Sequence, residues 1–162
     1  MSPLRVERTL RRIAAEVVER NRGVDRLLVF GVEHRGVGVA ERLAEAINEV
    51  SGREIAVHRL DVTAFRDDRE GTAPARPDGP DVQGKDVLVV DDVLFTGRTA
   101  RAAIDAVMHA GRPARIQLAV LVDRGHRELP VQPDYVGRVI PTAYRERVIV
   151  DVGGTPGVYL EE

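Results

Sequence analysis

The chain has 162 residues, a length typical of one domain built around one hydrophobic core. Hydrophobic residues make up 43% and charged residues 31%, and no apolar run approaches the ~20 residues that a membrane-spanning helix needs. The sequence holds no cysteine, which excludes disulfides and thiolate metal sites, and its net charge of −2 gives no general attraction for nucleic acids. Because the N-terminal residues also lack the apolar core of a secretion signal, these properties predict a cytoplasmic protein without a membrane segment.

The first residues are expected to form a surface helix. Val6, Leu10, Ile13 and Val17 recur at helical spacing, and charged side chains occupy the opposite face. Residues 1–22 hold six arginines but three glutamates, so the local charge is positive. The helix is therefore expected to present a basic face to solvent.

Aliphatic runs and helical stripes then alternate along the chain. Strands are expected at residues 27–32, 55–65, 87–90 and 116–122, with shorter ones at 135–140, 147–152 and 157–160. Helical stripes follow the first and third of these runs. This alternation indicates an α/β fold with a doubly wound, mainly parallel sheet flanked by helices. We expect residues 1–162 to form a single domain.

One segment fits neither a helix nor a strand. Residues 69–85, REGTAPARPDGPDVQGK, hold three prolines and three glycines without a regular period. Irregular loops longer than ~12–15 residues in compact domains are usually functional or disordered. We therefore expect a flexible lid.

Four informative loops begin where predicted strands end. They are EHRGVG after the first strand, the predicted lid after the second, DDVLFTGRT after the third and DRGHRELP after the fourth. Ligands of open parallel sheets bind outside the carboxyl ends of the strands. The four loops are therefore expected to converge on one site.

The stretch VLVVDDVLFTGRT predicts the kind of ligand. A helix is expected to follow it, and a helix N-terminus offers unpaired N–H groups and partial positive charge, which suit a phosphate. Gly97 permits a close backbone approach, and the hydroxyls of Thr96 and Thr99 add donors. Asp91 and Asp92 lie a few residues upstream, where ionised carboxylates suit the two vicinal hydroxyls of a ribose. The pattern indicates a ribose 5-phosphate.

A plainer interpretation of this stretch is a capped turn after a strand with two solvated acids. Other phosphate-binding folds fit less well, because the sequence contains neither G-x-x-x-x-G-K-[ST] nor the G-x-G-x-x-G order of a dinucleotide site. Phosphoacceptor receiver domains also carry acids on a strand, but the threonine–glycine turn would have no purpose there.

The same residues resemble a known family. VLVVDDVLFTGRT is similar to the phosphoribosyl pyrophosphate motif of type I phosphoribosyltransferases. More narrowly, RGVGVAERLA, DVTAFRDD and GRPARIQLAVLVDRGHRELPVQPDYVGRVIPT resemble the PyrR family of bifunctional pyrimidine operon regulators and uracil phosphoribosyltransferases. The likeness runs from the first predicted helix to Thr142, and VLVDRGHRELP is quite specific for this family.

The resemblance implies a reaction and its residues. Uracil and phosphoribosyl pyrophosphate would give UMP and pyrophosphate, with Mg²⁺ bridging the phosphoribosyl pyrophosphate, although no protein ligand of the metal follows from the likeness. Asp91, Asp92 and Arg35 would be the catalytic residues. The ribose 5-phosphate would be held by Asp91, Asp92, Val93, Leu94, Phe95, Thr96, Gly97, Arg98 and Thr99, pyrophosphate by His34, Arg35 and Gly36, and uracil by Asp123, Arg124, Gly125 and His126. The lid, at about residues 66–85, would begin with Arg66, Asp67 and Asp68.

The resemblance also implies a regulatory role. Members of the family bind the leader mRNA of pyrimidine biosynthesis genes more tightly with UMP, act by transcription attenuation or translational repression, and form homodimers or tetramers. The arginines that would contact RNA are Arg8, Arg11, Arg12, Arg20, Arg138 and Arg147. A solvated basic face explains these arginines equally well.

Two alternatives stay open. One is a regulator with weak catalysis that keeps the pocket as a nucleotide sensor, and the other is a phosphoribosyltransferase for another nucleobase. His34 stands where the family has threonine and Phe95 where it has tyrosine, and the first exchange is expected to affect turnover more than the second.

Overall fold

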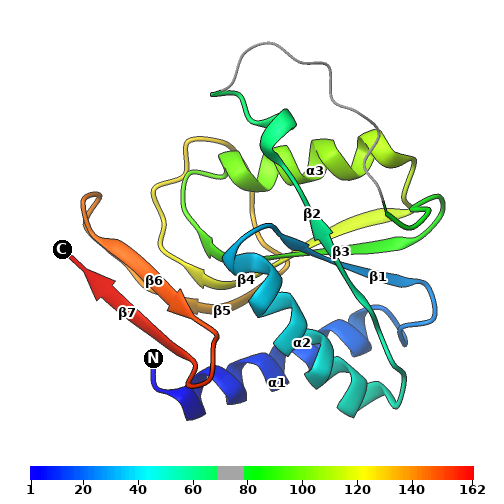
Figure 1. The fold of residues 1–162 in the computed structure, drawn as a ribbon, viewed down its shortest axis with the longest axis horizontal. Helices are drawn as coiled ribbons and strands as arrows, with labels where there is room; N and C mark the ends of the chain where they lie inside the picture. The colour runs from blue at the N-terminus through cyan, green and yellow to red at the C-terminus, as the bar shows by residue number, and fades with distance from the viewer. Residues whose placement is uncertain (69–78) are drawn as a thin grey trace.

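The structure is a computed structural model that describes residues 1–68 and 79–162 (Figure 1). Its helices are α1 (Pro3–Arg20), α2 (Arg35–Ser51) and α3 (Arg98–Ala110), with a short 3₁₀ helix η1 (Thr63–Phe65). Its strands are β1 (Leu27–Val32), β2 (Val57–Leu60), β3 (Asp86–Leu94), β4 (Arg115–Asp123), β5 (Tyr135–Val139), β6 (Arg147–Asp151) and β7 (Gly157–Glu161). The first five strands form one parallel sheet, which confirms the predicted fold class.

The order of the strands creates a natural ligand-binding edge. The sheet runs β2-β1-β3-β4-β5, so β1 lies between β2 and β3. The chain passes from β1 to β2 on one side, and then crosses back to β3, β4 and β5 on the other side. In open parallel sheets such a switch point leaves a crevice at the carboxyl ends of the strands. The loops that follow β1 and β3 border this crevice.

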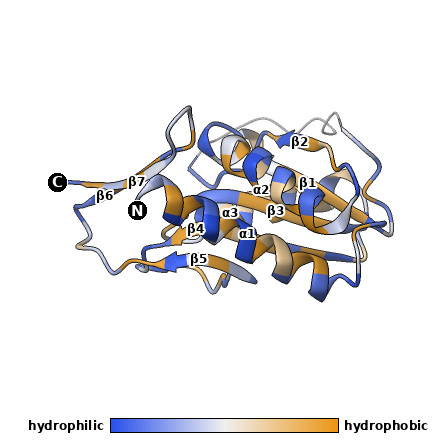
Figure 2. Ribbon diagram, turned by 90° about the horizontal axis from the view of Figure 1, so that it is seen from below, coloured by the Kyte–Doolittle hydropathy of each residue, from blue (hydrophilic) through white to orange (hydrophobic). Residues whose placement is uncertain are grey.

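Helices cover both faces of the sheet. α1 and α2 pack on one face, where Ile13 and Leu43 are fully buried, and α3 packs on the other through Ala103 and Val107 (Figure 1). Figure 2 shows the hydrophobic residues concentrated along the central strands between these layers. Among the described helices, none is long and apolar enough to cross a membrane.

The central strand explains the continuous aliphatic run of the sequence. In β3, Val87 and Val89 pack in the α3 layer, whereas Leu88 and Val90 pack in the layer of α1 and α2. A strand buried on both faces needs apolar residues at every position, so its sequence does not alternate.

Two of the predicted strands have other lengths than expected. The strand expected at residues 55–65 covers only Val57–Leu60, because the Asp61 carboxylate accepts the N–H of Thr63 at 2.9 Å and the chain turns into η1. The strand expected at residues 87–90 extends to Leu94, because β4 continues to pair with it. The paired acids therefore lie in a strand and not in the loop after it.

β6 and β7 form an antiparallel hairpin outside the main sheet. The N–H of Val158 donates to the carbonyl of Met1 at 3.1 Å, and Arg42 of α2 donates to the carbonyl of Val152 at 2.8 Å. These contacts fix the hairpin against α2 and the N-terminus. The hairpin does not pair with the main sheet, whose last strand is β5.

The predicted lid lies only partly within the described residues, because residues 69–78 fall outside them. Its far end is anchored: Val82 is fully buried, and the N–H of Gly84 donates to the carbonyl of Arg112 at 3.0 Å. Residues 82–85 are therefore part of the packed body of the protein.

Candidate functional site

A cavity of about 540 Å³ opens at the carboxyl ends of β1 and β3. This volume lies within the ~300–1,000 Å³ range of small-molecule pockets. The structure brings the predicted catalytic residues Asp91, Asp92 and Arg35 together in its wall. The full lining is Val32, Glu33, His34, Arg35, Asp61, Val62, Thr63, Arg66, Asp68, Asp91, Asp92, Val93 and Thr99.

The turn between β3 and α3 has the geometry of a phosphate cradle. Gly97 precedes the helix with φ = +92°, a left-handed conformation that suits glycine. The N–H of Arg98 reaches the Thr96 hydroxyl oxygen at a long 3.3 Å, while the N–H groups of the first helical turn have no backbone acceptor within the helix. The Thr99 side chain lines the cavity. Thr99 thus brings the start of α3 to the cavity beside the acids, whereas Leu94, Phe95, Thr96, Gly97 and Arg98, which were also predicted to hold the phosphate, are not among its lining residues.

The loop after β4 contacts this turn and donates backbone hydrogen bonds to it. The N–H groups of Glu128 and Leu129 both donate to the carbonyl of Thr96, at 2.9 and 3.1 Å. A Cβ added at Gly97 would lie 3.3 Å from the Cβ of Val131, so the two loops are in close contact. The phosphate turn is therefore positioned by residues far away in sequence.

The side chain of Arg127 connects the two loops. Its guanidinium donates to the carbonyls of Phe95 at 3.0 Å and Val131 at 2.9 Å, and to the Asp123 carboxylate at 2.6 Å. Burial pushes the pKa of Asp123 upward, but the hydrogen bonds from Arg127 and from the N–H of Gly125 outweigh it, so the pKa is lowered. Asp123 therefore stays ionised and keeps Arg127 in place.

Asp91 and Asp92 stand side by side in different surroundings. Asp91 is 9% exposed and Asp92 is half-buried. The Asp91 carboxylate accepts the N–H of Asp92 at 2.9 Å, and the Asp92 carboxylate accepts the N–H of Val93 at 2.8 Å. Burial, reinforced by the negative charge of Asp92, raises the pKa of Asp91 well above its usual range. Asp91 therefore holds a proton more tightly than an ordinary aspartate does.

The predicted pyrophosphate loop lies against these acids. His34 has φ = +74° and ψ = −120°, a conformation that side chains rarely adopt, and α2 begins directly after it at Arg35. Gly36 is buried, and a Cβ added there would lie 3.0 Å from the Asp91 carboxylate and 3.0 Å from the carbonyl of Val90. Glycine at position 36 therefore allows the loop to approach the end of β3.

The predicted uracil residues lie beside the cavity and do not form its lining. Arg124 is buried, and its guanidinium donates to the Thr142 hydroxyl at 2.9 Å and to the carbonyls of Ala143 at 2.9 Å and Tyr144 at 3.2 Å. The backbone N–H of Arg124 donates to the carbonyl of Leu94 at 3.0 Å. The side chain of Arg124 therefore holds residues 142–144, and the position of uracil stays a prediction.

The predicted start of the lid is joined to the phosphate turn. Asp67 forms an ion pair with Arg98, whose guanidinium also lies 3.6 Å from the Glu128 carboxylate. Arg66 and Asp68 line the cavity and contact each other at 3.2 Å. The described part of the lid thus borders the candidate site.

The arginines predicted to contact RNA are not equivalent. Arg12 donates to the carbonyls of Val136 at 3.0 Å and Gly137 at 2.7 Å, along the edge strand β5. Arg20 lies 3.4 Å from the Asp134 carboxylate. Both side chains have structural partners, which lowers their availability to phosphate groups. All six arginines of the set are nevertheless exposed, namely Arg8, Arg11, Arg12, Arg20, Arg138 and Arg147.

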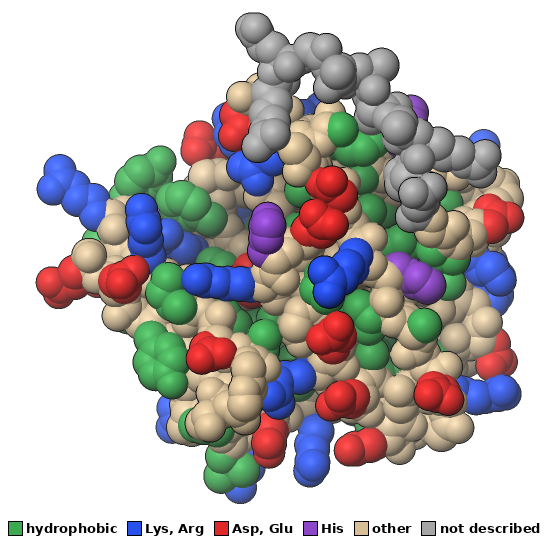
Figure 3. Space-filling model, in the orientation of Figure 1, with side chains coloured by type: hydrophobic (Ala, Val, Ile, Leu, Met, Phe, Trp, Pro, Cys, Tyr) green, Lys and Arg blue, Asp and Glu red, His purple; other side chains and the backbone are tan. Residues whose placement is uncertain are grey.

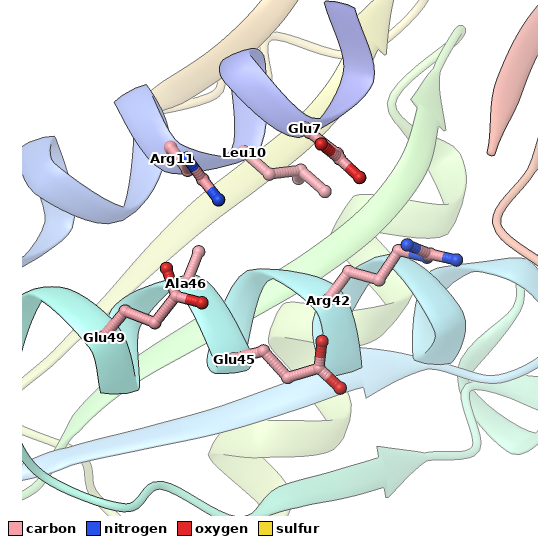
Figure 4. A pocket seen from close by; sticks show the side chains of 7 residues that line it. All are labelled: Glu7, Leu10, Arg11, Arg42, Glu45, Ala46 and Glu49. Carbon is pink, nitrogen blue, oxygen red and sulfur yellow. The ribbon is translucent and has the colours of Figure 1, made fainter. Parts of the chain in front are cut away.

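Arg11 lies in a second, smaller cavity. This cavity, of about 130 Å³, lies between α1 and α2 and is lined mainly by charged side chains (Figure 4). Glu45 and Glu49 line it from α2. Their negative charges weaken the positive potential that Arg11 offers to RNA.

Several residues of the site are absent from the set of site residues predicted from the sequence. Arg127 supports the phosphate turn, and Glu33 and Thr63 line the cavity. Glu33 directly follows β1, so its position at a strand end was the available signal. The role of Arg127 depends on contacts with Phe95, which no local pattern indicates.

Comparison with known proteins agrees with this fold. A family model described as the phosphoribosyl transferase domain matches residues 4–151. Hypoxanthine phosphoribosyltransferase from Trypanosoma cruzi, solved with its product IMP, superposes with a TM-score of 0.72 at 20% identity, covering 92% of this chain and 77% of that one. The corresponding Staphylococcus aureus structure gives a TM-score of 0.71 at 19% identity, covering 88% and 77%. At these identities the solved structures show the fold alone.

The fold and the family model define the class of the protein, a phosphoribosyltransferase and hence a glycosyltransferase. Among curated relatives, "Bifunctional protein PyrR" of Bacillus cereus (strain AH820) is 52% identical over 159 residues, covering 93% of this chain and 87% of the relative. The protein of the same name from Bacillus mycoides (strain KBAB4) is 51% identical over the same coverage. The chain therefore belongs to the PyrR family of bifunctional proteins.

Proposed function

We propose that the protein transfers the phosphoribosyl group of phosphoribosyl pyrophosphate to uracil, forming UMP and pyrophosphate, and that UMP controls its binding to the leader mRNA of pyrimidine biosynthesis genes. The observation that supports the enzymatic activity is that three parts border one cavity: the start of α3 with Thr99, the acids of β3 and the loop before α2. These parts suit a 5-phosphate, a ribose diol and a pyrophosphate, respectively.

The residues assist a reaction that separates charge. The bond from C1′ to pyrophosphate breaks, the bond from C1′ to N1 of uracil forms, and the N1 proton leaves. Positive charge develops on the ribose near Asp92, and negative charge develops on the pyrophosphate near Arg35. The protein positions the reactants and stabilises both charges, so it needs no nucleophilic side chain.

Mg²⁺ fits the donors at this cavity. Asp91 and Asp92 contribute hard carboxylate oxygens to its wall, and Mg²⁺ is commonly held by one or two carboxylates together with substrate phosphates and water. Within the part of the chain that the structure describes, no cluster of three metal-ligating side chains occurs, so the substrate would supply most ligands. When bound, the ion neutralises part of the pyrophosphate charge.

The proposed transfer of the phosphoribosyl group is tested by incubating the protein with radiolabelled uracil, phosphoribosyl pyrophosphate and Mg²⁺. We expect labelled UMP, and omission of phosphoribosyl pyrophosphate serves as the control. Absence of UMP at high protein concentration would remove the enzyme and leave the alternative of a nucleotide-sensing regulator with weak catalysis.

The choice of base is tested separately. A panel of uracil, cytosine, hypoxanthine and guanine, each competed against labelled uracil, should show uracil as the preferred acceptor. Preferential use of a purine would instead assign the protein to the transfer of another nucleobase.

Asp92→Asn tests the role of the more exposed acid. Loss of a charged hydrogen bond to the ribose is expected to lower kcat/KM by about 10- to 100-fold, since such bonds contribute roughly 1.5–3 kcal/mol. The thermal unfolding temperature should stay close to the wild-type value, because Asp92 is only half-buried. A variant that fails to fold would show that this carboxylate is structural.

The proposed regulatory function predicts that the affinity for RNA depends on UMP and on the salt concentration. A transcript of a pyrimidine operon leader should bind more tightly when UMP is present, because UMP and RNA stabilise the same state. Affinity should also fall steeply with salt, as expected for contacts between arginines and phosphates. Indifference to both UMP and salt would exclude this half of the proposal.

A further inference from the structure

Three rings form a cluster next to the phosphate turn. Phe95 lies 5.4 Å from Tyr144 and 5.7 Å from His126, and His126 lies 5.6 Å from Tyr144, measured between ring centroids. Phe95 belongs to the phosphate turn, whereas Tyr144 belongs to the loop that leads into β6. The cluster therefore connects the candidate nucleotide site to another part of the surface.

Arg124 ties the same two segments together. Its guanidinium carbon stands 4.1 Å from the centroid of the Phe95 ring, and its N–H groups donate to the carbonyls of Ala143 and Tyr144. The Nε2 of His126 lies 2.7 Å from the carbonyl of Thr142. Ring contacts and hydrogen bonds thus join Phe95 to residues 142–144.

The outer end of this connection is exposed and carries two arginines, with Glu146 between them. Tyr144 is 64% exposed, and the neighbouring Arg145 and Arg147 are exposed as well. Basic and apolar side chains lie next to one another at the left of Figure 3, over the segment that leads into β6. An exposed aromatic ring among arginines suits single-stranded nucleic acid, because the ring stacks on an unpaired base while the arginines contact phosphates.

We infer that Tyr144 is an RNA contact whose position depends on the occupancy of the nucleotide site. This inference rests on the proposed function, since it assumes that the protein binds leader RNA. A 5′-phosphate in the turn before α3 orders Phe95, and the ordered Phe95 fixes the ring of Tyr144. RNA then binds a tyrosine that is already in place, so less conformational entropy is lost on binding.

The test compares RNA affinity with and without UMP in four proteins: wild type, Tyr144→Ala, Tyr144→Phe and Tyr159→Ala. The probe is a transcript of a pyrimidine operon leader at fixed salt. Couplings between two sites are typically about 5- to 150-fold, so we expect a UMP stimulation of that order in the wild type. Tyr144→Ala should lose most of it, whereas Tyr144→Phe, which keeps the ring, should retain it.

Tyr159→Ala is the matched control, because Tyr159 is a similarly exposed tyrosine, at 56%, on β7. It should keep the wild-type stimulation. UMP affinity measured by calorimetry without RNA should be preserved in Tyr144→Ala, which also shows that this variant is folded. In the wild type, RNA should raise the affinity for UMP by the same factor by which UMP raises the affinity for RNA.

The outcomes separate the inference from the proposed function. A wild type without UMP stimulation would overturn the regulatory function and the inference with it. A stimulated wild type together with a Tyr144→Ala variant that keeps full stimulation would overturn the inference alone. Loss of stimulation in Tyr159→Ala to the same extent would also contradict it, because any exposed tyrosine would then have the same effect.

Discussion

Asp91 and Asp92, the acids of β3, show that residues of the site can lower the stability of the folded protein. Asp91 is buried at the end of a strand, its pKa is raised well above the usual range, and Asp92 places a second negative charge beside it. An unfolded chain would solvate Asp91 and lower its pKa again. The ionised form of Asp91 is therefore less favourable in the folded protein than in the unfolded one.

Asp91→Asn is expected to stabilise the protein at neutral and alkaline pH while lowering activity. The free energy of unfolding should rise, because burial and the charge of Asp92 penalise the ionised carboxylate in the folded protein and asparagine carries no charge. The gain should shrink as pH falls below the folded-state pKa of Asp91 and vanish below the ordinary pKa of an aspartate, because the carboxyl is then protonated in both the folded and the unfolded chain. Urea unfolding of both proteins at a series of pH values measures this difference, and a gain that grows in acid would contradict the account.

Gly97→Ala probes the phosphate turn at one position. The left-handed φ of +92° disfavours a side chain, which costs roughly 1–3 kcal/mol in such conformations. We expect a lower unfolding temperature and a higher KM for phosphoribosyl pyrophosphate. Gly154→Ala is the control, because nothing lies within 4 Å of an added Cβ there and no positive φ is recorded. Equal effects of the two substitutions would argue against a special role for Gly97.

At the scale of elements, the site depends on two loops that support each other. The turn after β3 supplies the donors, and the loop after β4 holds that turn through Arg127, Glu128 and Leu129. Neither loop has regular secondary structure between its strand and the next element, so their shape depends on these mutual contacts.

Arg127→Gln should therefore loosen the phosphate turn without removing any group that contacts substrate. We expect KM for phosphoribosyl pyrophosphate to rise by about tenfold with a smaller change in kcat, because charged hydrogen bonds contribute roughly 1.5–3 kcal/mol and glutamine keeps only part of them. Arg127→Lys should recover part of the loss. An unchanged KM in Arg127→Gln would mean that Glu128 and Leu129 hold the turn on their own.

The same two loops mark where sequence reasoning succeeded and where it stopped. The fold class followed from aliphatic runs that alternate with amphipathic helices, and the turn before α3 followed from the local pattern around Thr96 and Gly97, whereas its binding of phosphate stays a prediction. The end of β3 at Leu94 did not, because it depends on pairing with β4. The partners of Arg124 and Arg127 are contacts between distant segments, which periodicity does not encode.

At the scale of the whole molecule, the strand order explains why one edge of the sheet carries the chemistry. β1 and β3 are neighbours in the sheet although β2 lies between them in sequence, so the loops after them meet at the switch point. The hairpin of β6 and β7 packs against α1, α2 and β3, and the loop before it carries Tyr144, whose ring lies 5.4 Å from that of Phe95. The nucleotide site and the basic segment after Tyr144 are therefore parts of one connected surface.

The most direct measurement is a crystal structure of the protein with UMP. The account predicts that the 5′-phosphate accepts hydrogen bonds from N–H groups of residues 96–100 and that the ribose hydroxyls lie within hydrogen-bonding distance of the Asp92 carboxylate. A nucleotide bound elsewhere on the protein, with only solvent at the start of α3, would contradict it.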